Sequence, residues 1–101
     1  MRSQSENDIR SDFYVYLHKN ASDGKVFYVG KGTGKRAWSK KRQDYWHEHV
    51  DRVGGFSVDV IESDLSELEA LYREDYYIEK YSEMIINHQR SHDLKLEIDF
   101  D

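Results

Sequence analysis

The strongest constraint on the fold is a pair of β-rich segments separated by a short turn-forming sequence. The segments span residues 13–19 and 25–30, and both are rich in aromatic and β-branched side chains. Between them, residues 20–24 read Asn-Ala-Ser-Asp-Gly, and an Asp-Gly pair tolerates the positive φ angles that a hairpin loop requires. The sequence therefore predicts a β-hairpin, preceded by a polar and weakly ordered lead at residues 1–11.

The segment after the hairpin predicts a loop and then helical structure. Residues 31–34 read Lys-Gly-Thr-Gly, which we expect to leave the strand and form a loop. Apolar residues then recur at three- and four-residue spacing between residues 35 and 53, which predicts a helix in two pieces. Gly54 and Gly55 are expected to end it.

A third strand and a long helix follow. Residues 56–62 alternate apolar and polar side chains, as a half-buried strand does. Asp64 and Glu67 match a capping box, with Asp64 at the N-cap, and predict a helix that runs to about Tyr81. Residues 94–100 alternate again and predict a possible last strand. Together these elements indicate an α+β fold in which helices cover a small sheet.

Length and composition limit the class of protein. At 101 residues the chain predicts a single domain, which we place at residues 12–101. It contains no cysteine, which excludes disulfides and thiolate zinc sites. No apolar run approaches the ~18 residues of a membrane span, and no signal-peptide pattern opens the chain. We therefore expect a soluble intracellular protein.

Charge is distributed unevenly along the chain. The net charge is −5, yet residues 31–52 carry seven basic and three acidic side chains, a net of +4. Residues 59–83 carry nine acidic and two basic side chains, a net of −7. A basic region of this kind can meet phosphates, although both regions also fit solvated surfaces.

Two tyrosines on the predicted hairpin are candidates for chemistry. Tyr16 and Tyr28 lie on paired antiparallel strands, where side chains on one face come close together. Two phenols beside a phosphate can orient or deprotonate a water, but a pKa of about 10 requires a nearby cation for general-base work. The alternative is that both are core aromatics of a hairpin.

Two further features are of the type that phosphate chemistry uses. Arg36 follows the basic, glycine-rich segment at residues 31–35, where a guanidinium can form charge-assisted bonds to phosphate. The spacing is not that of a Walker loop. Glu74 lies in the middle of the long predicted helix, and one carboxylate can hold a Mg²⁺ that keeps several waters. The alternatives are a plain basic loop and a surface glutamate.

The order and spacing of these features resemble the GIY-YIG nuclease family over roughly residues 13–88. Tyr14-Val15-Tyr16 is similar to the first motif, and Tyr28-Val29-Gly30 to the second. The second motif continues as Lys-Gly, a form familiar among phage and some eukaryotic members. The positions that match functional residues of the family are Tyr16, Tyr28, Gly30, Arg36, Glu74 and Asn87.

The resemblance implies a three-stranded antiparallel sheet flanked by helices, and metal-dependent hydrolysis of phosphodiester bonds, usually in DNA. It implies that Tyr16 acts as general base or positions the water, with Tyr28 hydrogen-bonding near it. Arg36 would stabilise the scissile phosphate, and Glu74 would ligate a single Mg²⁺ or Mn²⁺. Asn87 would order the site. The expected location is the cytoplasm of a bacterial or phage-infected cell.

The basic residues near Arg36 are expected to hold backbone phosphates of DNA; they are Lys31, Lys35, Lys40, Lys41 and Arg42. Lys40 stands where many family members have a histidine. This departure keeps open a catalytically inactive GIY-YIG-like module that binds nucleic acid or protein, and the acidic balance keeps open a decoy for a basic partner. A homodimer or a partner protein that supplies targeting is also compatible with so short a chain.

Overall fold

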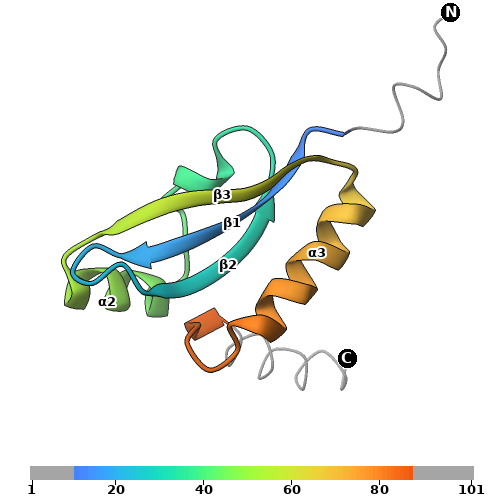
Figure 1. The fold of residues 1–101 in the computed structure, drawn as a ribbon. Helices are drawn as coiled ribbons and strands as arrows, with labels where there is room; N and C mark the ends of the chain where they lie inside the picture. Colours follow the sequence, from blue (N-terminus) through green and yellow to red (C-terminus); the bar gives the residue numbers. More distant parts are fainter. Residues whose placement is uncertain (1–10, 88–101) are drawn as a thin grey trace, which may run out of the picture.

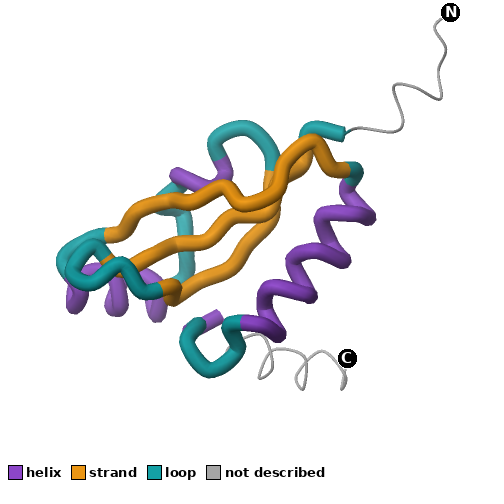
Figure 2. Tube along the Cα trace, viewed as in Figure 1, coloured by secondary structure: helices purple, strands orange, loops and turns teal. Residues whose placement is uncertain are grey.

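The computed structural model describes residues 11–87, in which a three-stranded antiparallel sheet has helices on both faces (Figure 1). The strands are β1 (Phe13–Asn20), β2 (Val26–Gly32) and β3 (Phe56–Leu65), in the order β2-β1-β3. The helices are the 3₁₀ turn η1 (Arg36–Trp38), α2 (Asp44–Val53) and α3 (Glu67–Lys80), coloured apart from the strands in Figure 2. The predicted α+β fold with its three-stranded sheet is confirmed.

The hairpin of β1 and β2 forms as predicted. Asn20 and Lys25 close the turn with a 2.8 Å backbone hydrogen bond, and Gly24 has a φ of 75°. The Asp23 carboxylate accepts hydrogen bonds from the Lys25 amide and the Asn20 side chain, both at 3.0 Å. The local turn chemistry therefore favours the hairpin.

The predicted loop at residues 31–34 is wrong in its first half. β2 continues to Gly32, because Lys31 pairs with Val15 and Gly32 with Tyr14 on β1. Gly32 is needed there, since a Cβ at this position would collide with the side chain of Arg36. The two helical pieces expected between residues 35 and 53 are present as η1 and α2, with residues 39–43 between them.

The predicted capping box at Asp64 is also wrong. The N-cap of α3 is Ser66, whose hydroxyl accepts from the Glu69 amide at 3.1 Å, while the Glu69 carboxylate accepts from the Ser66 amide at 2.8 Å. Asp64 instead lies in β3 with a φ of 60°. Pairing of β3 with β1 extends to Leu65, so the strand continues past the point where the local motif predicted a helix.

The two faces of the sheet carry different cores. Val15 and Leu17 of β1 face α3 and pack with Val29 and Ile85, while Tyr77, Ile78 and Tyr81 cover them. Tyr14 and Tyr16 point to the opposite face and pack against Ala37 of η1. This alternation is the period of two expected of a strand that is covered on both faces.

A β-bulge adds an aromatic side chain to the α2 side. His18 pairs with Tyr28 and Lys19 with Val26, which leaves Phe27 as the extra residue in β2. Phe27 packs against Trp46 and His49 of α2, with its ring centroid 4.3 Å from that of His49. The bulge therefore anchors α2 to the edge strand.

Some predictions lie beyond this part of the chain. The expected lead at residues 1–11 falls, apart from its last residue, outside the described residues, and the possible strand at residues 94–100 lies entirely outside them. The domain limits therefore stay a prediction. Within residues 11–87, no helix has the length and apolar character needed to cross a membrane.

Candidate functional site

Tyr16 occupies the centre of the sheet opposite Gly30. The two residues are paired across β1 and β2, and the Tyr16 side chain is 1% exposed. A Cβ at position 30 would overlap the Cζ and Oη atoms of Tyr16. The glycine of the second motif is therefore the residue that lets the tyrosine of the first motif lie flat across the neighbouring strand.

Arg42 joins the two candidate tyrosines. Its Nη1 donates to the Tyr16 hydroxyl at 2.8 Å and lies 3.4 Å from the Tyr28 hydroxyl. The guanidinium carbon lies 5.5 Å from the ring centroid of Tyr16 and 5.3 Å from that of Tyr28, and the two rings stack at 6.4 Å. We call these three residues the tyrosine site; the sequence placed the phenols side by side but did not place Arg42 between them.

The remaining donors of Arg42 bind backbone carbonyls. Nε donates to the Ser39 oxygen at 2.9 Å, and Nη2 donates to the Arg36 oxygen at 2.6 Å. Arg42 is therefore committed to holding residues 36–42 against the tyrosines. Of the residues expected to contact DNA phosphates, Lys35, Lys40 and Lys41 are exposed, whereas Arg42 is half-buried within the site.

The environment of Tyr16 opposes ionisation. Burial raises the pKa of its phenol, the neighbouring Tyr28 raises it further, and the guanidinium of Arg42 lowers it by a smaller amount. The phenol is therefore protonated at neutral pH. As Arg42 already donates to its oxygen, Tyr16 has its own proton available for an acceptor.

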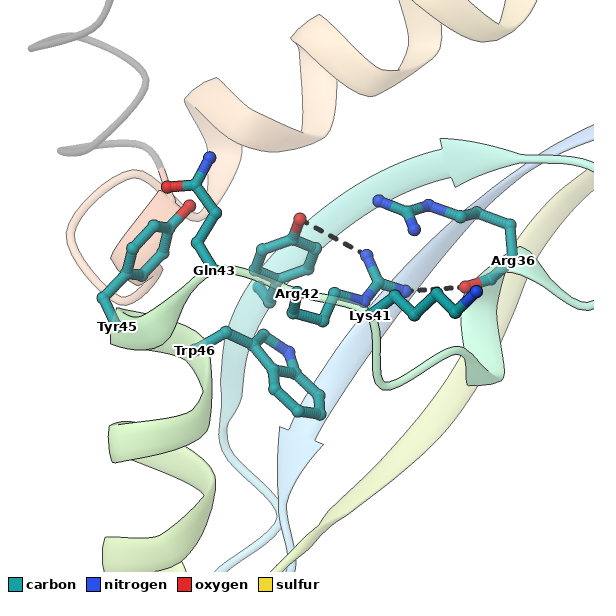
Figure 3. Close-up of a pocket in the computed structure, with 7 residues that line it drawn as sticks. Arg36, Lys41, Arg42, Gln43, Tyr45 and Trp46 are labelled. Atoms are coloured by element: carbon teal, nitrogen blue, oxygen red, sulfur yellow. Dashed lines mark hydrogen bonds between the residues drawn. The ribbon is translucent and has the colours of Figure 1, made fainter.

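A pocket of about 330 Å³ opens beside the tyrosine site (Figure 3). Its lining includes three cations, Arg36, Lys41 and Arg42, and the ring of Tyr28; the other lining residues are Gln43, Tyr45 and Trp46. None of the seven is acidic, so the pocket is suited to an anion. Tyr16 does not line it, because the side chain lies beneath Arg42.

Tyr14 fixes the turn that carries Arg36. Its hydroxyl donates to the Gly34 oxygen at 2.7 Å and accepts from the Ala37 amide at 2.9 Å. Tyr14 is thus the structural tyrosine of the first motif, and it sets the position of η1 relative to the pocket.

His18 is a buried residue that the sequence did not single out. Its Nδ1 accepts from the Trp46 indole at 3.0 Å, because an indole nitrogen can only donate. Its Nε2 therefore carries the proton and donates to the Ala37 oxygen at 2.7 Å. Burial lowers the pKa of His18 to about 4, so the ring is neutral and links β1 to η1 and α2. The strand alternation, which puts residues 14, 16 and 18 on one face, is the signal that points to it.

Glu74 lies on α3, the helix that packs on the other face of the sheet. It is half-buried, and burial raises the pKa of its carboxyl to about 7, although Lys31 of β2 lowers it. Among residues 11–87, none donates a hydrogen bond to this carboxylate, and none forms a group of three metal-binding side chains with it. The structure therefore brings Glu74 close to Lys31 of β2, and no hydrogen bond or ion pair among the described residues joins it to the tyrosine site.

The neighbour of Glu74 in the sequence fixes the helix. Arg73 forms a forked ion pair with Glu62 of β3, with its Nη2 at 2.6 Å from the carboxylate, and the Tyr77 hydroxyl donates to the same carboxylate at 2.7 Å. Hydrogen bonds from Arg73 and Tyr77 lower the pKa of Glu62. These contacts set the rotation of α3 and, with it, the position of Glu74.

Asn87 binds the backbone of β2 between Tyr28 and Gly30. Its amide nitrogen donates to the Val29 oxygen at 2.7 Å, and its side-chain oxygen accepts from the Val29 amide at 3.3 Å. Both groups of Val29 are thereby satisfied on the outer side of the sheet. Asn87 thus orders the strand that carries the second motif.

Comparisons with known proteins find no match to this chain. No protein-family model matches the chain, and no curated protein or solved structure matches it. The GIY-YIG assignment therefore stays a prediction from the motifs.

Proposed function

We propose that this protein is a metal-dependent endonuclease that hydrolyses phosphodiester bonds in DNA. The observation that supports this most directly is the pocket in which Tyr28, Arg36 and Arg42 meet without any acidic residue among its lining. A phosphate group fits such a pocket, because guanidinium groups match its geometry and its charge.

Arg36 is the residue we assign to the scissile phosphate. Its side chain is exposed at the pocket, whereas its backbone oxygen is occupied by Arg42. The guanidinium is thus free of the internal contacts that hold Arg42, and it can stabilise negative charge that develops on the phosphate.

The two tyrosines differ in how they reach a substrate. Tyr28 lines the pocket and can donate to a phosphate oxygen or orient a water molecule. Tyr16 lies beneath Arg42 with a raised pKa, and this favours the positioning role over that of general base. A general-base role for Tyr16 would require Arg42 to move aside and the phenol to lose its proton.

The environment of Glu74 suits a carboxylate that binds a divalent cation. The carboxylate is half-buried without a hydrogen bond from another described residue, and a cation offsets the cost of ionising such a group. Because Glu74 lies near Lys31 on the same edge strand as Tyr28, a Mg²⁺ or Mn²⁺ held there would supply Lewis-acid stabilisation to a phosphate of a substrate that extends from the pocket across the edge of β2. The exposed side chains of Lys35, Lys40 and Lys41 would bind neighbouring phosphates of the DNA.

Nicking of supercoiled plasmid with Mg²⁺ or Mn²⁺ tests this proposal. We expect wild type and Glu79→Ala to nick, because Glu79 is an exposed acid on the same helix. Glu74→Ala, Arg36→Ala and Tyr16→Phe should each lose activity. Nicking that survives all three substitutions would exclude this site as the origin of the activity.

The second candidate is a GIY-YIG-like module that binds nucleic acid and does not cleave it. It is favoured by Lys40 in place of the family histidine and by a cationic pocket that is complete without Glu74. DNA binding with no metal-dependent turnover at high protein concentration would establish this candidate instead. In either case, the Tyr-Val-Gly-Lys-Gly form of the motif is the basis for expecting a bacterial or phage-infected cytoplasm.

A further inference from the structure

Trp38 is an exposed indole on η1, the turn that also carries Arg36 of the cationic pocket. Its side chain is 55% exposed, although its neighbour Ala37 is fully buried. Of the two tryptophans in the chain, Trp46 is 1% exposed and serves the core, so solvent exposure of an indole is specific to position 38.

The indole stands on a rigid base. It packs edge-on against the ring of Tyr14, with the centroids 6.3 Å apart and the planes at 71°. Tyr14 is itself fixed by hydrogen bonds to Gly34 and Ala37. The ring of Trp38 is therefore presented in a defined orientation, which reduces the entropy lost when a flat partner stacks on it.

The segment that carries Trp38 is cationic. Residues 31–43 contain no acidic residue, and Lys35, Arg36, Lys40 and Lys41 are all exposed. Arg36 and Lys41 line the pocket, and Arg36 begins the same 3₁₀ turn that Trp38 ends. An aromatic platform among cations is the combination that single-stranded nucleic acids bind, since bases stack while phosphates pair with the charges.

We propose that Trp38 stacks on an unpaired base next to the phosphate in the pocket, so that the preferred substrate is single-stranded or locally unpaired DNA. This inference rests on the proposed function and specifies its substrate class. In a regular duplex the faces of each base are covered by its neighbours, and an indole has access to a base face only where stacking is interrupted.

Binding without metal tests this inference separately from cleavage. The probes are a labelled thymidine oligomer and a blunt-ended, fully paired DNA duplex, measured by fluorescence anisotropy in a chelating buffer at one fixed salt concentration. The variants are Trp38→Ala and Trp38→Phe. Tyr72→Ala serves as the matched control, because Tyr72 is an exposed aromatic on α3, the helix on the other face of the sheet.

We expect Trp38→Ala to weaken binding of the thymidine oligomer by about tenfold or more, and binding of the fully paired duplex by less than about twofold. Trp38→Phe should retain part of the affinity, and Tyr72→Ala all of it. Binding of the oligomer should also quench the tryptophan fluorescence of the wild type more strongly than that of Trp38→Phe, whose remaining indole, Trp46, lines the pocket but is 1% exposed. Circular dichroism melting confirms that each variant is folded.

Equal weakening on both probes, or no weakening on the oligomer, would overturn the inference. Selective binding of the oligomer through Trp38 without nicking under any metal condition would sustain the stacking site and refute the nuclease. Metal-dependent nicking at the same rate in the wild type and in Trp38→Ala on every probe would sustain the nuclease and refute the stacking site.

Discussion

The ring of Tyr16 lies against the backbone of Gly30, its partner across β1 and β2, with no room between them for a methyl group. The tyrosine of one motif thus depends on the glycine of the other. Overpacking a buried site of this kind typically costs about 1–3 kcal/mol.

Gly30→Ala is therefore expected to lower the free energy of unfolding by about 1–3 kcal/mol, as measured by urea denaturation. Tyr16→Val in the same chain should reduce that cost, because it removes the ring with which the new Cβ would collide. A double-mutant cycle measures this coupling. Additive effects of the two substitutions would contradict the packing described above.

Arg42→Lys should impair the site although the charge is retained. A lysine cannot reach both tyrosine hydroxyls and the carbonyls of Ser39 and Arg36 at once, because it lacks the planar fork. We expect a destabilisation of about 1–3 kcal/mol and at least about a tenfold loss of nicking. Lys35→Arg, at an exposed position in the same region, is the control and should leave both unchanged.

We expect the protein to become less stable at acidic pH because of the buried, neutral side chain of His18. Its folded pKa of about 4 lies below the unfolded value of about 6.5, so only the unfolded state takes up the proton between these values. The free energy of unfolding therefore falls by up to about 3 kcal/mol as the pH falls from 6.5 to 4. An NMR titration of the imidazole checks the cause directly. Protonation of His18 near pH 6.5 in the folded protein would refute it.

Glu74 should act in the opposite direction. Its folded pKa of about 7 lies above the ordinary value of 4.5, so ionising it destabilises the fold as the pH rises through this window. Glu74→Gln is expected to stabilise the metal-free protein by about 1–3 kcal/mol at pH 8. Added Mg²⁺ should then raise the Tm of wild type but not of Glu74→Gln. Equal shifts in both proteins would place the metal elsewhere.

Ser66→Ala is expected to cost about 1 kcal/mol, because it removes the hydroxyl that caps α3. Asp64→Asn should cost much less, as asparagine tolerates the positive φ found at that position. Chemical denaturation of the two variants compares them. A Ser66→Ala variant as stable as the wild type would contradict the cap formed by Ser66.

The difference between these two registers shows where sequence reasoning ends. The hairpin was predictable because its turn and its alternation are local. Both Asp64-x-x-Glu67 and Ser66-x-x-Glu69 satisfy the capping pattern, and the choice depends on how far β3 pairs with β1, which is a tertiary property. Local sequence therefore predicts the helix but not its first residue.

The same distinction applies to the site. Tyr16 and Tyr28 were placed together from strand pairing alone. Arg42 looked like one more surface cation, because its place between the phenols depends on the path of residues 39–43 back across the sheet. The sequence around His18 contains no indication that this side chain is buried, apart from its position in the alternating strand pattern.

Asn87 has a consequence for how the protein behaves at high concentration. By taking both backbone groups of Val29, it occupies one rung on the outer side of β2, where another chain would otherwise add a strand. Within the described residues, β3 is the sheet edge without such a cover. Removing the Asn87 amide would leave the backbone groups of Val29 unpaired on the outer side of β2. This would create a second exposed sheet edge, and aggregation through strand addition would then compete with folding.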